Sequence, residues 1–222
     1  MEATLIIKNA KQVVTSRGAS KSPKLKAALG EIKVIENGAV ALQEDKIIAV
    51  GTTEEVMAKL EIGPKTKVID AADKVVLPGL IDPHTHVVHG GSREHELDLK
   101  LKGVSYLDIL AQGGGILSTV KSTREASKEE LVKRGLKYCR QMLQQGTTTA
   151  EAKSGYGLTT ESEIKTLEAI KEVNENQPVD LVPTFLGAHA IPTEHKKDPD
   201  KYLDIVINEM LPPVAEKGLA EY

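Results

Sequence analysis

The sequence predicts an α/β protein in which a small β-rich domain, residues 1–74, precedes part of a (β/α)8 TIM-like barrel, residues 75–222. Short apolar segments separated by turn signals fill the first third of the chain, whereas strand and helix patterns alternate after Val75. Such alternation is typical of βαβ units and a parallel sheet. A closed barrel typically takes about 250 residues, so we expect the N-terminal part of a longer barrel protein, stopped at Tyr222.

The β-rich domain is expected to consist of short strands and one helix. The predicted strands are Thr4–Ile7, Gln12–Thr15, Ala39–Leu42 and Lys46–Val50, with turns at Glu36-Asn37-Gly38 and Glu44-Asp45. Residues 52–60 are typical of a short helix. Residues 16–30 contain basic side chains and no acid. We interpret them as a solvated loop, with an anion-binding loop as the alternative.

The barrel portion is expected to contain three strands and three helices. The predicted strands are Val75–Ile81 (interrupted by Pro78-Gly79), Thr147–Ala152 and Val179–Gly187. The predicted helices are residues 128–145, residues 161–176 and a segment from Asp198-Pro199 to a break at Pro212-Pro213. Ser127 with Glu130, and Thr160 with Glu163, match the capping-box spacing at helix starts.

The composition excludes several classes of partner. The 222 residues are 40% hydrophobic and 27% charged with a net charge of −3, so no basic excess attracts nucleic acid. Tryptophan is absent and Phe185 is the only phenylalanine, which leaves few rings for base stacking. The single cysteine, Cys139, fits a reducing compartment, and we find no signal peptide or membrane span. We therefore expect a cytoplasmic protein with no nucleic-acid or membrane partner.

The strongest chemical signal is the pair His84 and His86, which directly follows an apolar strand. In an extended segment the two-residue spacing puts both imidazoles on one face, and two neutral imidazoles are half of a zinc-type site. A bare His-x-His also arises by chance in polar turns. The preceding strand favours the metal interpretation, as does Gly90-Gly91, where backbone can approach a ligand closely.

Three further residues lie where a ligand could be recognised. Arg93 is suited to bind a carboxylate through two parallel hydrogen bonds, or it forms a surface ion pair with Glu94 or Glu96. Tyr156 lies in a glycine-flanked loop after a strand, where it reaches a substrate or only packs the loop. His189 ends an apolar strand, a place where a lone histidine is often a satisfied structural group.

Longer blocks around these residues identify a family. Residues 78–86, PGLIDPHTH, resemble the metal motif of the amidohydrolase superfamily. Four further blocks resemble imidazolonepropionases within that superfamily: GGSRE at 90–94, KGVSYLDILAQGGGILSTV at 102–120, GTTTAEAKSGYGL at 146–158 and PVDLVPTFLGAHAIP at 178–192. The resemblance extends from about Thr4 to the end of the chain and is strongest over residues 78–192.

The resemblance implies hydrolysis of 4-imidazolone-5-propanoate to N-formimidoyl-L-glutamate in histidine degradation, by water activated on one Zn²⁺ or Fe³⁺ per chain. It implies metal ligands at His84 and His86. It implies substrate contacts at Arg93 (to the propionate), Tyr156, His189 (to the imidazolone ring) and, more weakly, Tyr106. The family's later His and Asp ligands and its catalytic Glu would lie beyond Tyr222. We therefore expect no catalytic residue and no turnover in these 222 residues, and a homodimer at full length.

Two other functions stay open. One is a different cyclic-amide hydrolase of the hydantoinase or dihydroorotase type, in which a carboxylated lysine bridges two metals and Lys153 would be that residue. The other is a binding module that keeps the sheet but not the chemistry. Glu151 is the carboxylate nearest the expected catalytic end, but no feature of the sequence marks it as the general base.

Overall fold

The computed structural model describes residues 2–15 and 24–222, which fall into two compact units, Met1–Pro78 and Gly79–Tyr222. The division after Pro78 falls four residues beyond the domain boundary that we predicted at Lys74. Of the basic loop that we predicted at residues 16–30, residues 16–23 lie outside the described residues. None of the helices within the described ranges has the length and hydrophobicity needed to cross a membrane.

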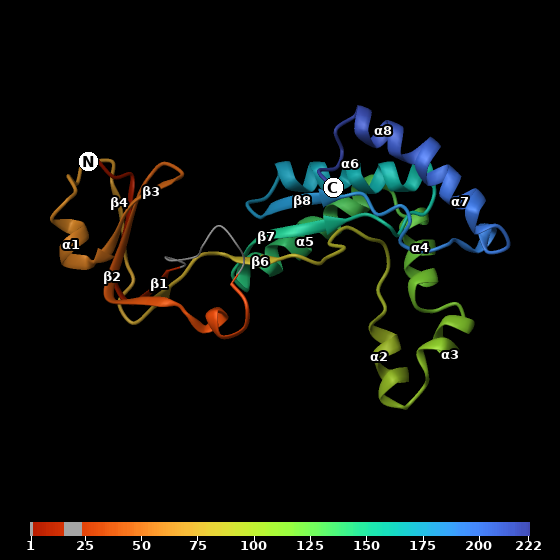
Figure 1. Ribbon diagram of the computed structural model, residues 1–222, viewed down its shortest axis with the longest axis horizontal. Helices are drawn as coiled ribbons and strands as arrows, with labels where there is room; N and C mark the ends of the chain where they lie inside the picture. The colour runs from red at the N-terminus through yellow and green to blue at the C-terminus, as the bar shows by residue number, and fades with distance from the viewer. Residues whose placement is uncertain (1, 16–23) are drawn as a thin grey trace. The chain divides into compact units, whose positions relative to one another are not determined.

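The first unit is built around strand β1, Leu5–Thr15, which has a neighbour on each side (Figure 1). It pairs with β2 in antiparallel and with β4 and β5 in parallel, and β2 continues through a hairpin into β3. The remaining elements are a 3₁₀ helix (Lys26–Gly30), β2 (Lys33–Gln43), β3 (Lys46–Thr52), α1 (Thr53–Met57), β4 (Lys67–Asp70) and β5 (Val75–Val76). The predicted hairpin is confirmed, and so is the short helix, which begins at a capping box between Thr52 and Glu55.

Two predictions in this unit are wrong for one reason: turn-forming residues occur inside strands. The two segments predicted around residues 4–15 are a single strand with a register shift near Asn9, whose φ is +58°. The predicted turn at Glu36-Asn37-Gly38 lies within β2, where Asn37 has a φ of +47°. A Cβ at Gly38 would lie 2.5 Å from Cγ2 of Val13, so only glycine fits beneath β1. The register shift near Asn9 is a bulge, whereas the pairing of β1 with β2 continues in register across Asn37 without a chain reversal.

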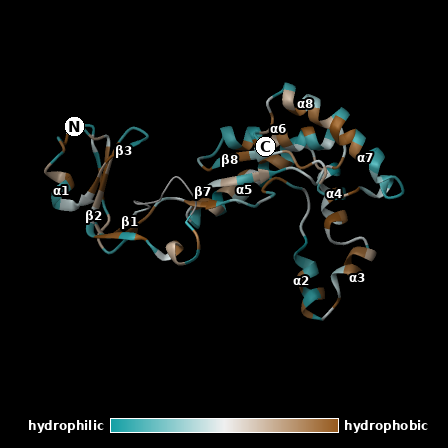
Figure 2. Ribbon diagram, in the orientation of Figure 1, coloured by the Kyte–Doolittle hydropathy of each residue, from teal (hydrophilic) through white to brown (hydrophobic). Residues whose placement is uncertain are grey.

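The second unit contains a parallel sheet in the order β6-β7-β8, as the alternating pattern predicted. Its strands are β6 (Leu80–Asp82), β7 (Thr147–Lys153) and β8 (Asp180–Thr184). Its helices are α2 (Glu94–Leu101), α3 (Tyr106–Ala111), α4 (Ile116–Glu125), α5 (Lys128–Gln144), α6 (Thr160–Glu175), α7 (Pro199–Ile205) and α8 (Leu211–Glu216). Helices α2 and α3 project away from the sheet (Figure 1), and α3 is the more hydrophobic of the two (Figure 2).

The predicted first strand of the barrel portion is divided between the two units. Val75 and Val76 pair with β1 in the first unit, whereas Leu80–Asp82 pair with β7 in the second. Gly79 lies just before β6 against β7, where an added Cβ would come 2.0 Å from Oγ1 of Thr148. The Pro78-Gly79 dipeptide is therefore the point where the chain leaves one sheet and enters the other.

The main core lies between the β6-β7-β8 sheet and the helices α5 and α6. Its buried members include Leu131, Cys139, Ala150, Ala152, Leu167, Ile170, Val173 and Leu181. These residues recur at helical spacing in α5 and α6 and at alternate positions in β7. The apolar spacing that predicted each element therefore also identifies the face that the element buries. The capping box at Ser127 and Glu130 is confirmed.

Two further helix predictions need correction. Helix α6 is capped by Thr159, whose side chain accepts from the amide of Ser162, and Glu163 is directed elsewhere. The Pro212-Pro213 pair does not end the helix that begins at Pro199. It lies in the first turn of α8, after a π-helical segment at Val206–Met210, where missing amide donors cost little.

Cys139 provides a test of this core. Its thiol is 1% exposed, and burial raises its pKa to about 11 from a usual 9. Because the thiolate is the reactive form, a pKa raised by two units lowers the reactivity of Cys139 about 100-fold, before the restricted access of the reagent is counted. We expect iodoacetamide at pH 8 to label Cys139 at least about 100-fold faster in denaturant than in the native protein, measured by peptide mass spectrometry. Equal labelling rates in the two states would contradict the packing.

Candidate active site

The carboxyl ends of β6, β7 and β8 are held together by hydrogen bonds that continue beyond the strands. The hydroxyl of Thr85 donates to the carbonyl of Glu151 (2.5 Å), and the amide of Lys153 donates to the carbonyl of Thr85 (3.0 Å). The amide of Ser154 donates to the carbonyl of Thr184 (3.0 Å). Side chains that follow the three strands therefore meet at one edge of the sheet, the edge where α/β proteins bind ligands.

His84 and His86 flank Thr85 in this continued ladder, and their environments differ. His84 is exposed, whereas His86 is partly buried, and its Nδ1 atom is buried without a hydrogen-bond partner in the described residues. Burial, followed by the neighbouring His189 and Lys153, lowers the pKa of His86 to about 4. The imidazole is therefore neutral near pH 7, which is the form that binds a metal.

An aromatic cluster surrounds His86. Its ring stacks on His189 with centroids 4.7 Å apart and lies 4.3 Å from the ring of Tyr156. Tyr156 and His189 are themselves 5.2 Å apart, and Nδ1 of His189 lies 3.0 Å from the carbonyl of Gly155. The structure thus brings together residues that follow three different strands and are separated by up to about a hundred positions in the sequence.

A pocket of about 220 Å³ opens beside this cluster. Its lining residues are His86, His89, Ser92, Arg93, Thr119 and Tyr156. Burial raises the pKa of Tyr156, and the nearby guanidinium of Arg93 opposes that shift. Arg93 forms no ion pair within the described part of the chain, in contrast to the surface pairing with Glu94 or Glu96 that we considered as its alternative. It is therefore available to an anionic ligand.

The other predicted substrate residues lie outside the pocket lining. His189 adjoins the pocket through His86 and Tyr156, which both line it. Tyr106 is the first residue of α3, and it is 48% exposed. Its hydroxyl lies close to Gly115 at the start of α4. The structure therefore places Tyr106 on α3, outside the pocket lining but near enough to Tyr156 to contribute to the raised pKa of that phenol.

Glu151 and Lys153 neutralise each other at the ends of the strands. Lys153 is 5% exposed, and its ammonium lies 2.6 Å from Oε2 of Glu151, while the hydroxyl of Thr184 donates to Oε1 at 2.9 Å. These partners, with Lys153 first, lower the pKa of Glu151. A carboxylate stabilised in this way is a weak proton acceptor, so Glu151 is poorly suited to be a general base.

A complete metal site is not formed by the part of the chain that the structure describes. No group of three or more His, Cys, Asp or Glu side chains in residues 2–15 and 24–222 is arranged to hold an ion. The unpartnered Nδ1 of His86 and the exposed imidazole of His84 nevertheless fit two of the ligands of such a site.

Several residues around the site were not recognised from the sequence. Ser92 and Thr119 line the pocket. Glu163 accepts from backbone amides of the loop that carries Tyr156. The carboxylate at the start of α6 was a usable signal for this last contact, because such groups often bind nearby amides. No comparable signal marks Thr119.

Comparisons with known proteins show what this chain is similar to. The amidohydrolase family model matches residues 75–214. The chain is 58% identical over 224 residues to an imidazolonepropionase from Alkaliphilus metalliredigens and 48% identical over 219 residues to one from Geobacillus kaustophilus. These alignments cover 100% and 98% of this chain but 52% of each relative. The chain therefore spans about half the length of the curated relatives it matches, and the resemblance drawn from short blocks is confirmed along its length.

Two solved structures share the fold. Guanine deaminase from E. coli matches with a TM-score of 0.56 at 18% identity, over 80% of this chain and 36% of the deaminase. A zinc-bound adenosine deaminase from Xanthomonas campestris matches with a TM-score of 0.55 at 17% identity, over 94% of this chain and 41% of that protein.

Gly155 tests the close packing after β7. Its φ is +104°, and an added Cβ would lie 2.7 Å from the carbonyl oxygen of Leu186 and 2.8 Å from Cβ of His189. Gly155→Ala should combine a positive-φ penalty of about 1–2 kcal/mol with an overpacking penalty of about 1–3 kcal/mol, measured by urea unfolding. Gly218→Ala is the matched control, because Gly218 has a φ of +57° and nothing within 4 Å. Equal destabilisation by both substitutions would contradict this arrangement.

Proposed function

Because the chain belongs to the amidohydrolase family, we propose that the whole protein hydrolyses the cyclic amide of 4-imidazolone-5-propanoate to N-formimidoyl-L-glutamate, a step of histidine degradation. One observation carries the substrate choice. The pocket has the unpaired guanidinium of Arg93 beside the imidazole of His86 and the phenol of Tyr156. The imidazolonepropionases that match the whole chain support the same choice.

Each of these groups suits one part of the proposed substrate. The guanidinium of Arg93 binds the propionate through paired hydrogen bonds, which fixes the orientation of the ring. Tyr156 contacts the bound substrate from the loop after β7, and His189 orients His86 by stacking while hydrogen-bonding the imidazolone ring. Tyr106, which is close enough to Tyr156 to affect its pKa, is a weaker substrate contact. The substrate is a small molecule, and this role requires no nucleic-acid or membrane partner.

The cofactor in this proposal is one Zn²⁺ or Fe³⁺ per chain, held in part by His84 and His86. The family and the zinc-bound structural neighbour support a metal cofactor. When bound, the ion would lower the pKa of a water molecule and polarise the amide carbonyl. The neutral imidazole of His86 provides a ligand without first losing a proton near pH 7.

We propose that the rest of the whole protein supplies the remaining ligands, the general base and the strands that close the barrel. The half-length coverage of the relatives supports this division. The neutralisation of Glu151 by Lys153 supports a base outside the described residues. A homodimer in the cytoplasm completes the proposal, and the single buried cysteine is compatible with a reducing compartment.

Metal analysis tests the assigned ligands. In the whole protein we expect His86→Ala to lower both the bound metal and kcat to about a tenth or less, because the ion itself generates the nucleophile. His84→Ala should behave in the same way. His95→Ala is the control, since His95 is exposed on α2 and outside the pocket. Full metal content in His86→Ala would disprove the assignment.

The metal stoichiometry of the unsubstituted protein separates the alternative hydrolase. One ion per chain fits the proposal. Two ions would favour a hydantoinase-like enzyme with a carboxylated Lys153. The ion pair with Glu151 opposes that modification, because a carboxylated Lys153 would carry a negative charge beside the Glu151 carboxylate.

Steady-state kinetics test the role of Arg93. Arg93→Ala should raise KM with little loss of metal, because Arg93 binds a carboxylate remote from the scissile bond. Truncation of such a contact costs about 2–5 kcal/mol, or roughly 30-fold to several-thousand-fold in kcat/KM. Arg93→Lys should recover only part of this loss, because an ammonium lacks the planar fork. Arg140→Ala, at an exposed position of α5, is the control. A normal KM in Arg93→Ala would exclude the propionate contact.

A further inference from the structure

Residues 154–158, the Tyr156 loop, connect β7 to α6 in an unusual backbone conformation. Gly155 has a φ of +104°, and Leu158 has a φ of +53° although it is a buried leucine. A side chain with a Cβ rarely adopts such an angle unless surrounding contacts impose it. Contacts from neighbouring elements must therefore hold this loop in place.

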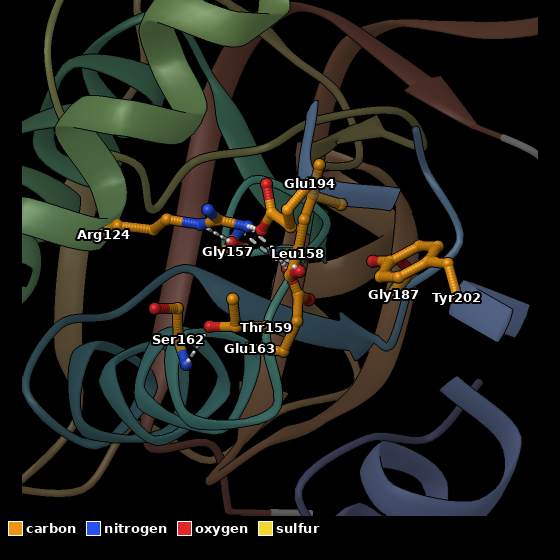
Figure 3. A network of polar contacts seen from close by, with 9 residues as sticks. All are labelled: Arg124, Gly157, Leu158, Thr159, Ser162, Glu163, Gly187, Glu194 and Tyr202. Carbon is orange, nitrogen blue, oxygen red and sulfur yellow. Dashed lines mark hydrogen bonds and ion pairs between the residues drawn. The ribbon is translucent and has the colours of Figure 1, made fainter. Parts of the chain in front are cut away.

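Glu163 supplies the first set of contacts. Its carboxylate is 0% exposed, and no cation is bonded to it within the described chain; it accepts hydrogen bonds from backbone amides instead (Figure 3). Oε1 accepts from Gly157 (2.7 Å) and Leu158 (2.8 Å), and Oε2 accepts from Gly155 (2.9 Å). A buried charge satisfied by three amides resists displacement, because any movement of the loop would leave it unpaired.

Arg124, in α4, holds the opposite side of the same peptides. Its Nε donates to the carbonyl of Gly157 (2.7 Å), and Nη2 donates to the carbonyl of Leu158 (3.1 Å). The guanidinium is held in turn by Glu194 at 2.8 Å (Figure 3). The carboxylate of Glu163 thus binds the amides of Gly157 and Leu158, and the guanidinium of Arg124 binds the carbonyls of the same two residues.

Tyr156 lies between the fixed residues. The amides of Gly155 and Gly157, one on each side, both bind Glu163. The ring of Tyr156 lines the pocket and lies 4.3 Å from that of His86. Rotation of either flanking peptide would therefore move the phenol relative to the bound substrate.

We propose that Glu163 is a positioning residue that acts through Tyr156, with Arg124 as its counterpart on the carbonyl side. This inference rests on the proposed function, because it assigns the carboxylate a role in that reaction beyond stability. Glu163 touches neither substrate nor metal. It fixes the loop backbone so that the Tyr156 hydroxyl is already in place when substrate binds.

The test compares E163Q with E161Q in the whole protein. In E163Q the charge is lost and an NH₂ group faces an amide donor of the loop, whereas Glu161 is an exposed carboxylate in the same helical turn. E161Q therefore controls for the lost negative charge at the start of α6. We expect kcat/KM to fall about 10- to 100-fold in E163Q and less than about twofold in E161Q, with unchanged metal content in both.

A double-mutant cycle with Tyr156→Phe shows whether Glu163 acts through the tyrosine. In the Tyr156→Phe background, E163Q should lower kcat/KM less than about threefold, because the group that it positions has been removed. An undiminished effect in that background would overturn the inference. R124K provides the same cycle if E163Q does not accumulate as folded protein.

Hydrogen exchange gives a readout that does not depend on activity. The amides of the peptide covering residues 154–159 should exchange at least about tenfold faster in E163Q than in E161Q. Equal exchange would show that Glu163 does not hold the loop. If the unsubstituted protein fails to hydrolyse the imidazolone, the proposed function is wrong and the inference falls with it. Hydrolysis without coupling to Tyr156 overturns the inference alone.

Discussion

The hydrogen-bond ladder of β6, β7 and β8, extended beyond the strands by Thr85 and Ser154, is the constraint on which the candidate site depends. Parallel pairing brings all three carboxyl ends to one edge, and the extension keeps the chain in register as far as His86. Without it, His86 and Tyr156, 70 positions apart in sequence, would have no common neighbour. The sheet itself is held by the core beneath α5 and α6, so burial of apolar side chains ultimately determines where the polar groups lie.

The sequence predicts the parts of this arrangement that follow from local periodicity. Helix α5 agrees with its capping box and apolar stripe, and β7 agrees with its β-branched residues. Helix α3 had a usable signal in Ser105, which accepts from the amide of Asp108, although the glycines on either side concealed it. Asn37-Gly38 was misinterpreted because positive φ occurs inside a strand as well as in a turn, and only the proximity of β1 shows that these residues belong to β2. The π segment at residues 206–210 has no local cause that we can name.

In the candidate site, the sequence predicted the chemically conspicuous residues but not the partners that tertiary packing brings to them. His86, Arg93 and Tyr156 are chemically conspicuous and line one pocket. Glu163 matched a local capping pattern equally well, but in the folded chain three loop amides satisfy its carboxylate better than one amide at the helix start. Thr119 is an ordinary helical residue until the fold places it beside Arg93. Long-range partners of this kind are set by tertiary packing, which short motifs do not encode.

The polar groups at the strand ends divide into those that satisfy one another and those left available. Glu151, Lys153 and Thr184 form a closed set, and so do Glu163, Arg124 and the peptides of the Tyr156 loop. His86 and Arg93, in contrast, have atoms without a protein partner in the described residues. A ligand gains most from groups whose hydrogen bonds the protein has not already made. An unpartnered imidazole nitrogen is suited to a metal ion and an unpaired guanidinium to a carboxylate, so the chemistry of the ligand follows from what the fold leaves unsatisfied.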